Sequence, residues 1–128
     1  MRDIRIEKLA NNLLSHSINL QKGEKILIEV IGMDAIPLGK ELIKQAERIG
    51  ALPFFNIIDY EIMREMLIGA TEEQMQVYAK HDLQRMKDMD AYIGIRASTN
   101  TAELNGISKE KWNYIINTIL YLFTLKKE

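Results

Sequence analysis

The sequence contains no cysteine and only two histidines, His16 and His81. The absence of cysteine excludes disulfide bonds, thiol nucleophiles and every metal site that needs a thiolate. Two histidines are too few for this chain alone to build a histidine-rich zinc site, and no H-E-x-x-H motif occurs. We therefore expect the chain to bind no metal by itself and to contain no catalytic residue.

An excess of charge and a long apolar run are also missing. The 17 basic and 18 acidic side chains give a formal charge of −1, so the charge balance does not favour nucleic acid. The longest mainly apolar stretch, 114–125, contains polar residues and is far shorter than the roughly 20 residues of a membrane span. The first residues alternate charged and apolar side chains, unlike a signal peptide. We expect a cytoplasmic protein with neither nucleic-acid nor membrane partners.

Helical and strand patterns alternate along the chain, and this alternation predicts an α/β fold. Apolar runs at 25–30, 52–58 and 91–95 have the composition of strands, and the segments between them have the periodicity of helices. The connections are too long for hairpins, so we expect right-handed crossovers onto a parallel sheet. The simplest arrangement is a small open sheet of three or more strands in the order 2-1-3, flanked by helices, within a domain spanning 1–108.

Individual residues mark where these elements begin and end. Asp3 and Thr71 are expected to cap helices, Thr71 in a capping box with Gln74, and Gly50 is a suitable helix stop. Pro53 lies within the second strand, which predicts a sheet edge or a strand that starts just after the proline. Five methionines fall on predicted helices at the spacing of core residues, and we expect them to pack in the core: Met63, Met66, Met75, Met86 and Met89.

The residues that follow this domain, 109–128, form a tail with a pattern of their own. Apolar side chains recur at helical spacing from Trp112 to Phe123. This spacing predicts a C-terminal amphipathic helix over 109–125, which either covers the sheet or pairs two copies of the chain into a homodimer. A strand is the competing outcome, because several of these side chains are β-branched: Ile115, Ile116 and Ile119.

In an open α/β sheet, ligands bind beside the carboxyl ends of the strands. Three polar residues near the predicted strand ends are therefore candidates to face a substrate: Asp34, Arg96 and Asn100. The guanidinium of Arg96 could clamp a carboxylate, whereas the more common roles are a helix cap for Asp34 and a solvated surface position for Arg96. Neither G-x-G-x-x-G nor G-x-x-x-x-G-K-[ST] follows the first strand, so the nucleotide-binding fingerprints are absent.

Three stretches together resemble one family. They are R-I-E-K-L-A running to K-G-E-K-I-L-I within 5–28, P-L running to A-E-R-I-G-A-L-P within 37–53, and D-A-Y-I-G-I-R-A at the start of 90–106. In their order and spacing they resemble the N-terminal domain of the aminopeptidase T/aminopeptidase S family of metal-dependent exopeptidases. No single stretch is a catalytic signature.

The resemblance implies an N-terminal α/β domain that helps to wall a substrate cavity, followed by a larger domain with two divalent metal ions of the zinc or cobalt type. The implied reaction removes N-terminal amino acids from peptides with metal-activated water. The family's metal ligands lie in the later domain, and no residue here corresponds to them. We therefore expect a truncated or isolated aminopeptidase domain, inactive alone, that meets peptide substrates only in the full-length context.

The tail departs from the family, whose members continue with a tyrosine-rich stretch that contains proline. Codons for residues 117–127 can be chosen so that one added base yields K-Y-Y-T-I-P-V-H-F-E-K, which is closer to the family. We therefore hypothesise a frameshift that shortened a longer aminopeptidase, with a cut domain or a short paralogue as rivals. The alternative function is a non-catalytic binding or assembly module that uses the strand-end loops for a carboxylate-bearing ligand. A receiver-like or nucleotide domain is disfavoured because phosphate loops are absent.

Overall fold

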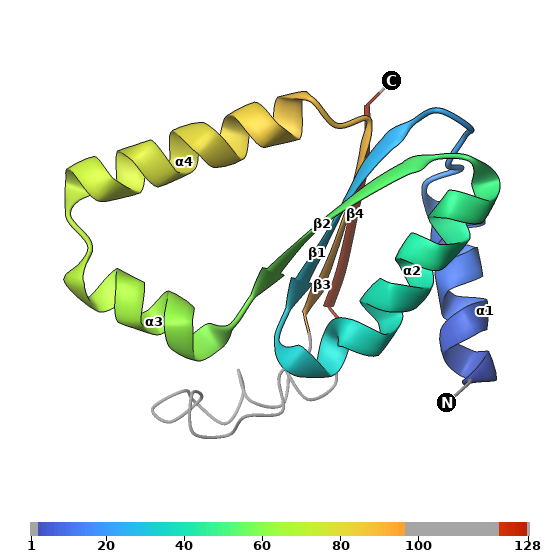
Figure 1. Cartoon of the computed structure of the whole chain (residues 1–128), viewed down its shortest axis with the longest axis horizontal. Helices are drawn as coiled ribbons and strands as arrows, with labels where there is room; N and C mark the ends of the chain where they lie inside the picture. The colour runs from blue at the N-terminus through green and yellow to red at the C-terminus, as the bar shows by residue number, and fades with distance from the viewer. Residues whose placement is uncertain (1–2, 97–120, 128) are drawn as a thin grey trace.

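The computed structural model of the chain describes residues 3–96 and 121–127, and Figure 1 shows how their helices and strands follow one another. One π-helical turn extends the first helix, and a 3-10 turn precedes the second. In chain order the elements are α1 (Ile4–Asn12), the π-helical turn (Leu13–Ser17), β1 (Lys25–Ile31), the 3-10 turn (Met33–Ala35), α2 (Ile36–Ile49), β2 (Leu52–Ile58), α3 (Tyr60–Gly69), α4 (Glu72–Lys87), β3 (Ala91–Arg96) and β4 (Tyr121–Lys126).

The four strands form one sheet in the order β2-β1-β3-β4. β1 runs parallel to β2 and to β3, whereas β4 is antiparallel to β3. The order of the three parallel strands confirms the predicted 2-1-3 arrangement and the α/β class. Ile31 pairs with Ile58 on β2 and with Arg96 on β3, so the three parallel strands end in one row. The loops that follow them leave the sheet from the same edge.

The C-terminal tail differs from the helix expected over 109–125. Residues 109–120 lie outside the described part of the chain, and the prediction is wrong for the segment that follows, because Tyr121–Lys126 forms β4. Aromatic residues and threonine favour strands, and the edge of β3 offers a row of backbone donors and acceptors. At the far end of β4, the Lys126 ammonium lies 2.9 Å from the Glu24 carboxylate. Pairing with β3 therefore prevails over the helical periodicity.

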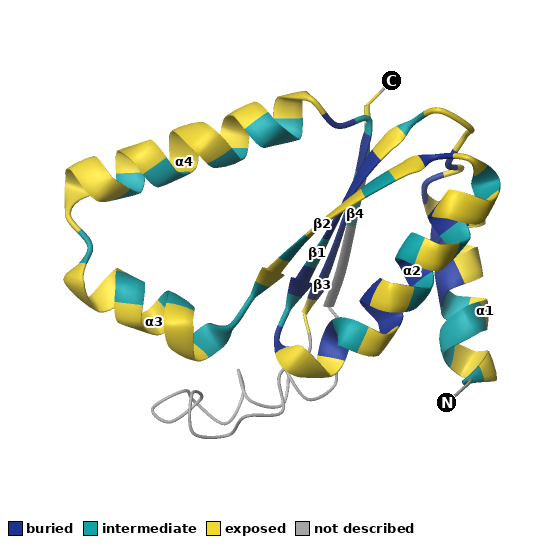
Figure 2. Ribbon diagram, viewed as in Figure 1, coloured by how far each residue is buried: buried dark blue, intermediate teal, exposed yellow. Residues whose placement is uncertain are grey.

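The hydrophobic core lies on the face of the sheet that α1 and α2 cover, as Figures 1 and 2 show. Alternate residues of β1 and β3 point to this face, which is why both strands have apolar side chains at every second position. These side chains pack against buried residues of the two helices and the π-helical turn. The core includes Ala10, Leu14, Ile26, Ile28, Val30, Leu38, Leu42, Ala46, Ala91, Ile93 and Ile95.

The predicted cap residues occupy the positions expected of them. The Asp3 carboxylate accepts a hydrogen bond from the Arg5 N–H at 2.9 Å, and the Thr71 hydroxyl accepts one from the Gln74 N–H at 3.1 Å. Gly50 ends α2 with a φ of 88°, a left-handed conformation that glycine adopts without a steric penalty. These local signals fix where the first, second and fourth helices begin or end.

α3 and α4 form an arm on the other side of the sheet, and Figure 2 shows it almost entirely in the colours of exposed and intermediate residues. Neither helix buries a residue. The expectation that five methionines pack in the core is therefore confirmed only for Met89. It is wrong for the other four, because helical spacing predicts an apolar stripe but not what covers it: Met63, Met66, Met75 and Met86. No helix within residues 3–96 and 121–127 is long and apolar enough to cross a bilayer.

One face of the sheet is packed and the arm is open, so we expect the same substitution to change the free energy of unfolding by different amounts in the two places. Leu42 on α2 is fully buried, whereas Leu67 on α3 is 51% exposed. We expect Leu42→Ala to lower the free energy of unfolding by about 2–5 kcal/mol through lost burial and a cavity. Leu67→Ala should change it by less than about 0.5 kcal/mol. Urea denaturation followed by circular dichroism measures both, and equal losses would contradict this placement of the core.

Candidate functional site

The carboxyl-end edge of the parallel strands carries two of the three residues predicted to face a substrate. Arg96 is the last residue of β3 and is exposed. Asp34 lies in the 3-10 turn that follows β1. Asn100 lies outside the described residues, so its placement stays a prediction. The register that aligns the strand ends puts Asp34 and Arg96 after neighbouring strands, as open α/β sheets arrange their ligand loops.

The acidic residues at this edge have different local roles. Ala35 occupies the N-cap position of α2, so Asp34 is not its N-cap residue. Asp59, directly after β2, is the N-cap of α3, and its carboxylate accepts a hydrogen bond from the Ile62 N–H at 3.1 Å. In strand order the edge therefore presents Asp59, Asp34 and Arg96, two acidic residues followed by one cation.

A polar cluster that the sequence analysis missed lies on the open face of the sheet. Glu29 on β1 accepts two hydrogen bonds, one at each carboxylate oxygen. The Tyr92 hydroxyl on β3 donates to Oε1 at 2.8 Å, and the Asn56 amide on β2 donates to Oε2 at 3.1 Å. The sequence contains one signal for this cluster, because Glu29 is the single charged residue in the interior of an otherwise apolar strand.

Gly94 gives the Tyr92 ring the room that this geometry needs. Gly94 pairs in register with Glu29, and a Cβ added at Gly94 would lie 2.7 Å from the Tyr92 hydroxyl oxygen. Such a contact is far shorter than atoms tolerate, so any other residue would displace the ring. The absence of a side chain at Gly94 therefore lets the Tyr92 hydroxyl reach the Glu29 carboxylate on the neighbouring strand, β1.

Burial and the carboxylate beside it keep the Tyr92 hydroxyl protonated. Burial is the largest cause that raises the pKa of Tyr92 far above its ordinary value, and the hydrogen bond to Glu29 raises it further. Arg96 and Arg85 lower that pKa, but by less. Tyr92 therefore acts as a neutral hydrogen-bond donor to Glu29.

A groove of about 660 Å³ lies between α4 and this face of the sheet. Arg85 adds a cation to it and is paired with Asp82 at 3.0 Å. The Arg85 Nε is buried and has no hydrogen-bond partner within the described part of the chain. Apolar walls with a few polar groups are typical of sites for small ligands. The apolar lining comes from one face of α4 and from β1: Leu27, Met75, Tyr78, Ala79, Leu83 and Met86.

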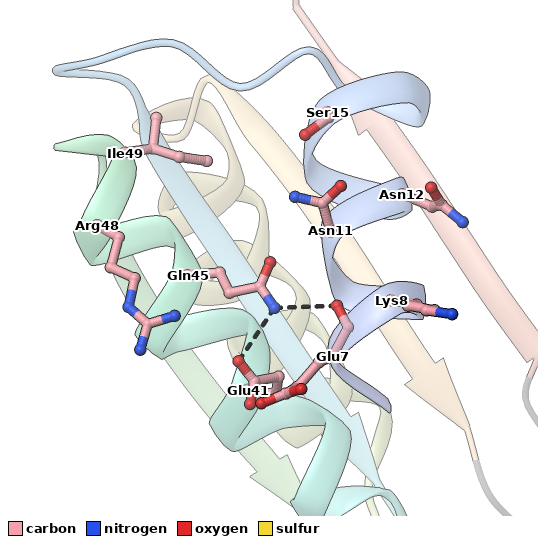
Figure 3. Close-up of a pocket in the computed structure, with 9 residues that line it drawn as sticks. All are labelled: Glu7, Lys8, Asn11, Asn12, Ser15, Glu41, Gln45, Arg48 and Ile49. Carbon is pink, nitrogen blue, oxygen red and sulfur yellow. Dashed lines mark hydrogen bonds between the residues drawn. The ribbon is translucent and has the colours of Figure 1, made fainter. Parts of the chain in front are cut away.

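A second groove, between α1 and α2, is polar and serves helix packing. Figure 3 shows its lining, with Gln45 at the centre. The Gln45 amide donates to the backbone oxygen of Glu7 and to the Glu41 carboxylate, both at 3.0 Å. This bridge joins the two helices on the side of α1 and α2 away from the strand-end loops. These two hydrogen bonds hold α1 against α2.

No group of three or more histidine, aspartate or glutamate side chains that could hold a metal ion occurs in residues 3–96 and 121–127. His16 lies in the π-helical turn and His81 on α4, and both are exposed. The described fold and sites thus define an open α/β domain with two ligand-accessible regions, the strand-end edge and the groove under α4.

Comparison with known proteins assigns this domain to a family. Residues 2–118 match the thermophilic metalloproteases of family M29, and the chain belongs to that family, which confirms the resemblance seen in the sequence. Among solved structures the chain is similar to wild-type AmpT from Thermus thermophilus, with 24% identity and a TM-score of 0.53. That similarity, which at this identity concerns the fold alone, covers 89% of this chain and 30% of that chain. The search of curated proteins found no significant match.

The Tyr92–Glu29 hydrogen bond predicts a stability difference that depends on pH. Tyr92→Phe should lower the free energy of unfolding by about 1 kcal/mol at pH 7, because one carboxylate oxygen loses its donor. The folded state holds the pKa of Tyr92 above the value of about 10 found in an unfolded chain. Above about pH 10 the unfolded chain therefore loses a proton that the folded chain keeps, and the wild type loses stability.

The difference in stability between wild type and Tyr92→Phe should accordingly shrink as the pH rises from about 10. Urea denaturation at a series of pH values measures it. Tyr78→Phe removes a hydroxyl from the α4 wall of the same groove, leaves the Glu29 hydrogen bond intact, and should keep wild-type stability at pH 7. A difference that stays constant up to pH 11 would show that the hydroxyl of Tyr92 is not held in its neutral form.

Proposed function

We propose that this chain acts as the N-terminal α/β domain of a metal-dependent aminopeptidase, an enzyme that removes N-terminal amino acids from peptides. The match of residues 2–118 to family M29 carries the proposal. The chain spans 30% of the length of AmpT, which agrees with the role of one domain within a larger enzyme. In that role it contributes part of the wall of the substrate cavity.

The described residues do not fit the two divalent metals, of the zinc or cobalt type, that the family resemblance implies. A metal centre of that kind needs several ligands that converge on one point. His16 and His81 lie on different elements with exposed side chains. No step of the reaction is therefore derived through a metal on these residues. We infer that peptide hydrolysis needs ligands from outside them and that the chain alone is inactive.

The groove under α4 supports a role in holding the peptide. Its apolar walls suit an apolar side chain of a substrate. The guanidinium of Arg85, whose side chain is 36% exposed beside Asp82, is a cation suited to a peptide carbonyl or carboxylate. Two hydrogen bonds, from Tyr92 and Asn56, orient the Glu29 carboxylate on the sheet side of the groove.

A direct assay tests the inactivity of the chain alone. Purified chain incubated with zinc or cobalt and a chromogenic leucine anilide should release no chromophore above the metal blank. The physical reason is that residues 3–96 and 121–127 contain no converging ligand set that could bind a metal and activate water. Chromophore release that scales with protein concentration and disappears with a chelator would contradict the proposal. The Tyr92→Phe variant, run in parallel, would show whether any such release depends on the groove.

The second candidate function is that of a non-catalytic binding module, and one observation favours it. Arg96 is exposed at the carboxyl-end edge of the sheet, where α/β domains bind ligands. A guanidinium there is suited to bidentate contact with a carboxylate. Asp34 and Asp59 at the same edge disfavour multiply charged anions, so a ligand with one carboxylate and a cationic group, such as a peptide, fits the charges best.

Thermal denaturation tests this candidate. A dipeptide should raise the melting temperature of the wild type, and Arg96→Ala should weaken its apparent affinity about tenfold or more, because a charge-assisted bond is lost. Arg48→Ala, in the last turn of α2 near the amino end of β2, removes an equal charge at the opposite end of the strands and is the matched control. Equal effects of the two substitutions, or no shift with the wild type, would count against binding at Arg96.

A further inference from the structure

The Glu29 carboxylate lies half-buried in the groove under α4, and no cation stands beside it. No ion pair within residues 3–96 and 121–127 includes Glu29. Its two hydrogen-bond donors, the Tyr92 hydroxyl and the Asn56 amide, are neutral groups. A partly buried carboxylate usually has a cationic partner, because removing its charge from water is costly. A cation is therefore the component that this cluster would gain from a ligand.

The two neutral donors leave the carboxylate able to bind a ligand. A carboxylate accepts about four hydrogen bonds, and each oxygen of Glu29 accepts one from its neighbours in the sheet. Tyr92 donates from β3 and Asn56 from β2, the strands on either side of β1, so they fix the direction of the carboxylate. Glu29 also lines the groove, where its remaining acceptor positions are available to a donor.

The charges that line the groove favour a cationic group. They belong to Glu29, Asp82 and Arg85, two carboxylates and one guanidinium. Asp82 and Arg85 pair with each other at 3.0 Å, so among these three the Glu29 carboxylate is the one without a counterpart. The rings of Tyr78 and Tyr92 line the same groove, and aromatic faces attract cations. An ammonium group of a ligand complements this arrangement.

The rest of the lining indicates what the ammonium is attached to. The α4 side chains of Met75, Leu83 and Met86 line the groove and suit an aliphatic group. Arg85 donates one hydrogen bond to Asp82, and a guanidinium has five N–H donors, so Arg85 can also donate to a carbonyl oxygen. An ammonium, an aliphatic side chain and a carbonyl on one small body are the groups of the N-terminal residue of a peptide.

We propose that the groove under α4 binds the N-terminal residue of a peptide, with the α-ammonium at Glu29, an apolar side chain against α4 and the first carbonyl oxygen at Arg85. The groove, of about 660 Å³, has the size of a small-ligand site. This inference rests on the proposed function and names the end of the peptide that the domain holds. Glu29 acts as a binding residue and takes part in no chemical step.

Glu29→Gln removes the charge and keeps the shape of the side chain. The glutamine oxygen can accept from the Tyr92 hydroxyl, and the Asn56 amide can turn over and accept from the glutamine nitrogen. Both contacts within the sheet therefore survive, and circular dichroism should show the wild-type fold. The matched control is Glu47→Gln, which removes an equal charge from an exposed position on α2, on the other side of the sheet.

Leucinamide has all three groups and no carboxylate, and it is the probe. Titrated into the ¹⁵N-labelled chain, it should shift the amide signals of Glu29 and its register partner Gly94, with a dissociation constant on the order of 1 mM. Glu29→Gln should raise that constant about tenfold or more, because the charge-assisted hydrogen bond is lost. Glu47→Gln should bind as the wild type does. No saturable shift, or equal affinity of wild type and Glu29→Gln, would overturn the proposal.

Three relatives of leucinamide each lack one of its groups. N-acetyl-leucinamide has no ammonium, glycinamide no aliphatic side chain and isoamylamine no carbonyl. Each should bind more weakly than leucinamide, and N-acetyl-leucinamide about tenfold or more. Affinity of N-acetyl-leucinamide equal to that of leucinamide would overturn the contact between the ammonium and Glu29. Equal affinity for isoamylamine would show a site for simple amines and overturn the peptide terminus as its ligand.

Two further comparisons separate the groove from the strand-end edge and from the proposed function. Arg96→Ala should not weaken leucinamide binding, because leucinamide has no carboxylate. A loss with Arg96→Ala but not with Glu29→Gln would place the ligand at the edge and overturn the groove. Absence of leucinamide binding would refute the groove site alone. Failure of the proposed function has a different signature, chromophore release from the leucine anilide by the chain alone.

Discussion

The pairing of β1 on both of its edges is the constraint on which the rest of the structure depends. β1 is the one strand with two parallel neighbours in the described sheet, and its register places the carboxyl ends of three strands in one row. Alternate side chains of β1 point to opposite faces of the sheet, one packed against helices and one open. Ile26 and Ile28 point to the helices α1 and α2, and Leu27 and Glu29 point to α4. A one-residue slip would exchange these faces and place a carboxylate in the core.

This division separates a packed face of the sheet from an open one. The face under α1 and α2 is closed and apolar, and it provides the buried area that holds the domain together. The other face has the polar cluster around Glu29, the groove beneath α4 and an arm without a buried residue. A surface of this kind, apolar and open, is typical of a domain that contacts a ligand or another protein surface.

Much of the fold could be predicted because local and periodic signals coincide. The strands, the caps Asp3 and Thr71 and the edge position of Pro53 each follow from side chains within a few residues. The choice between helix and strand in the tail, where a strand was the competing outcome, could not be made from the sequence, because it depends on the unpaired edge of β3, which lies distant in sequence. The methionines of α3 and α4 show the same limit, since periodicity does not say whether an apolar face is covered. The Glu29–Tyr92 contact spans 63 residues of sequence and needs the register of β1 and β3.

We propose that this chain, a member of family M29, acts as a non-catalytic domain of a metal-dependent aminopeptidase, and complementation tests this proposal most directly. The chain is titrated into the remaining part of an M29 aminopeptidase, prepared without its own N-terminal domain and loaded with zinc or cobalt. The rate of hydrolysis of a leucine anilide should rise from a low level and saturate as the chain is added. The chain alone should show no hydrolysis. Hydrolysis by the chain alone, or a rate in the mixture that does not respond to the chain, would contradict the account.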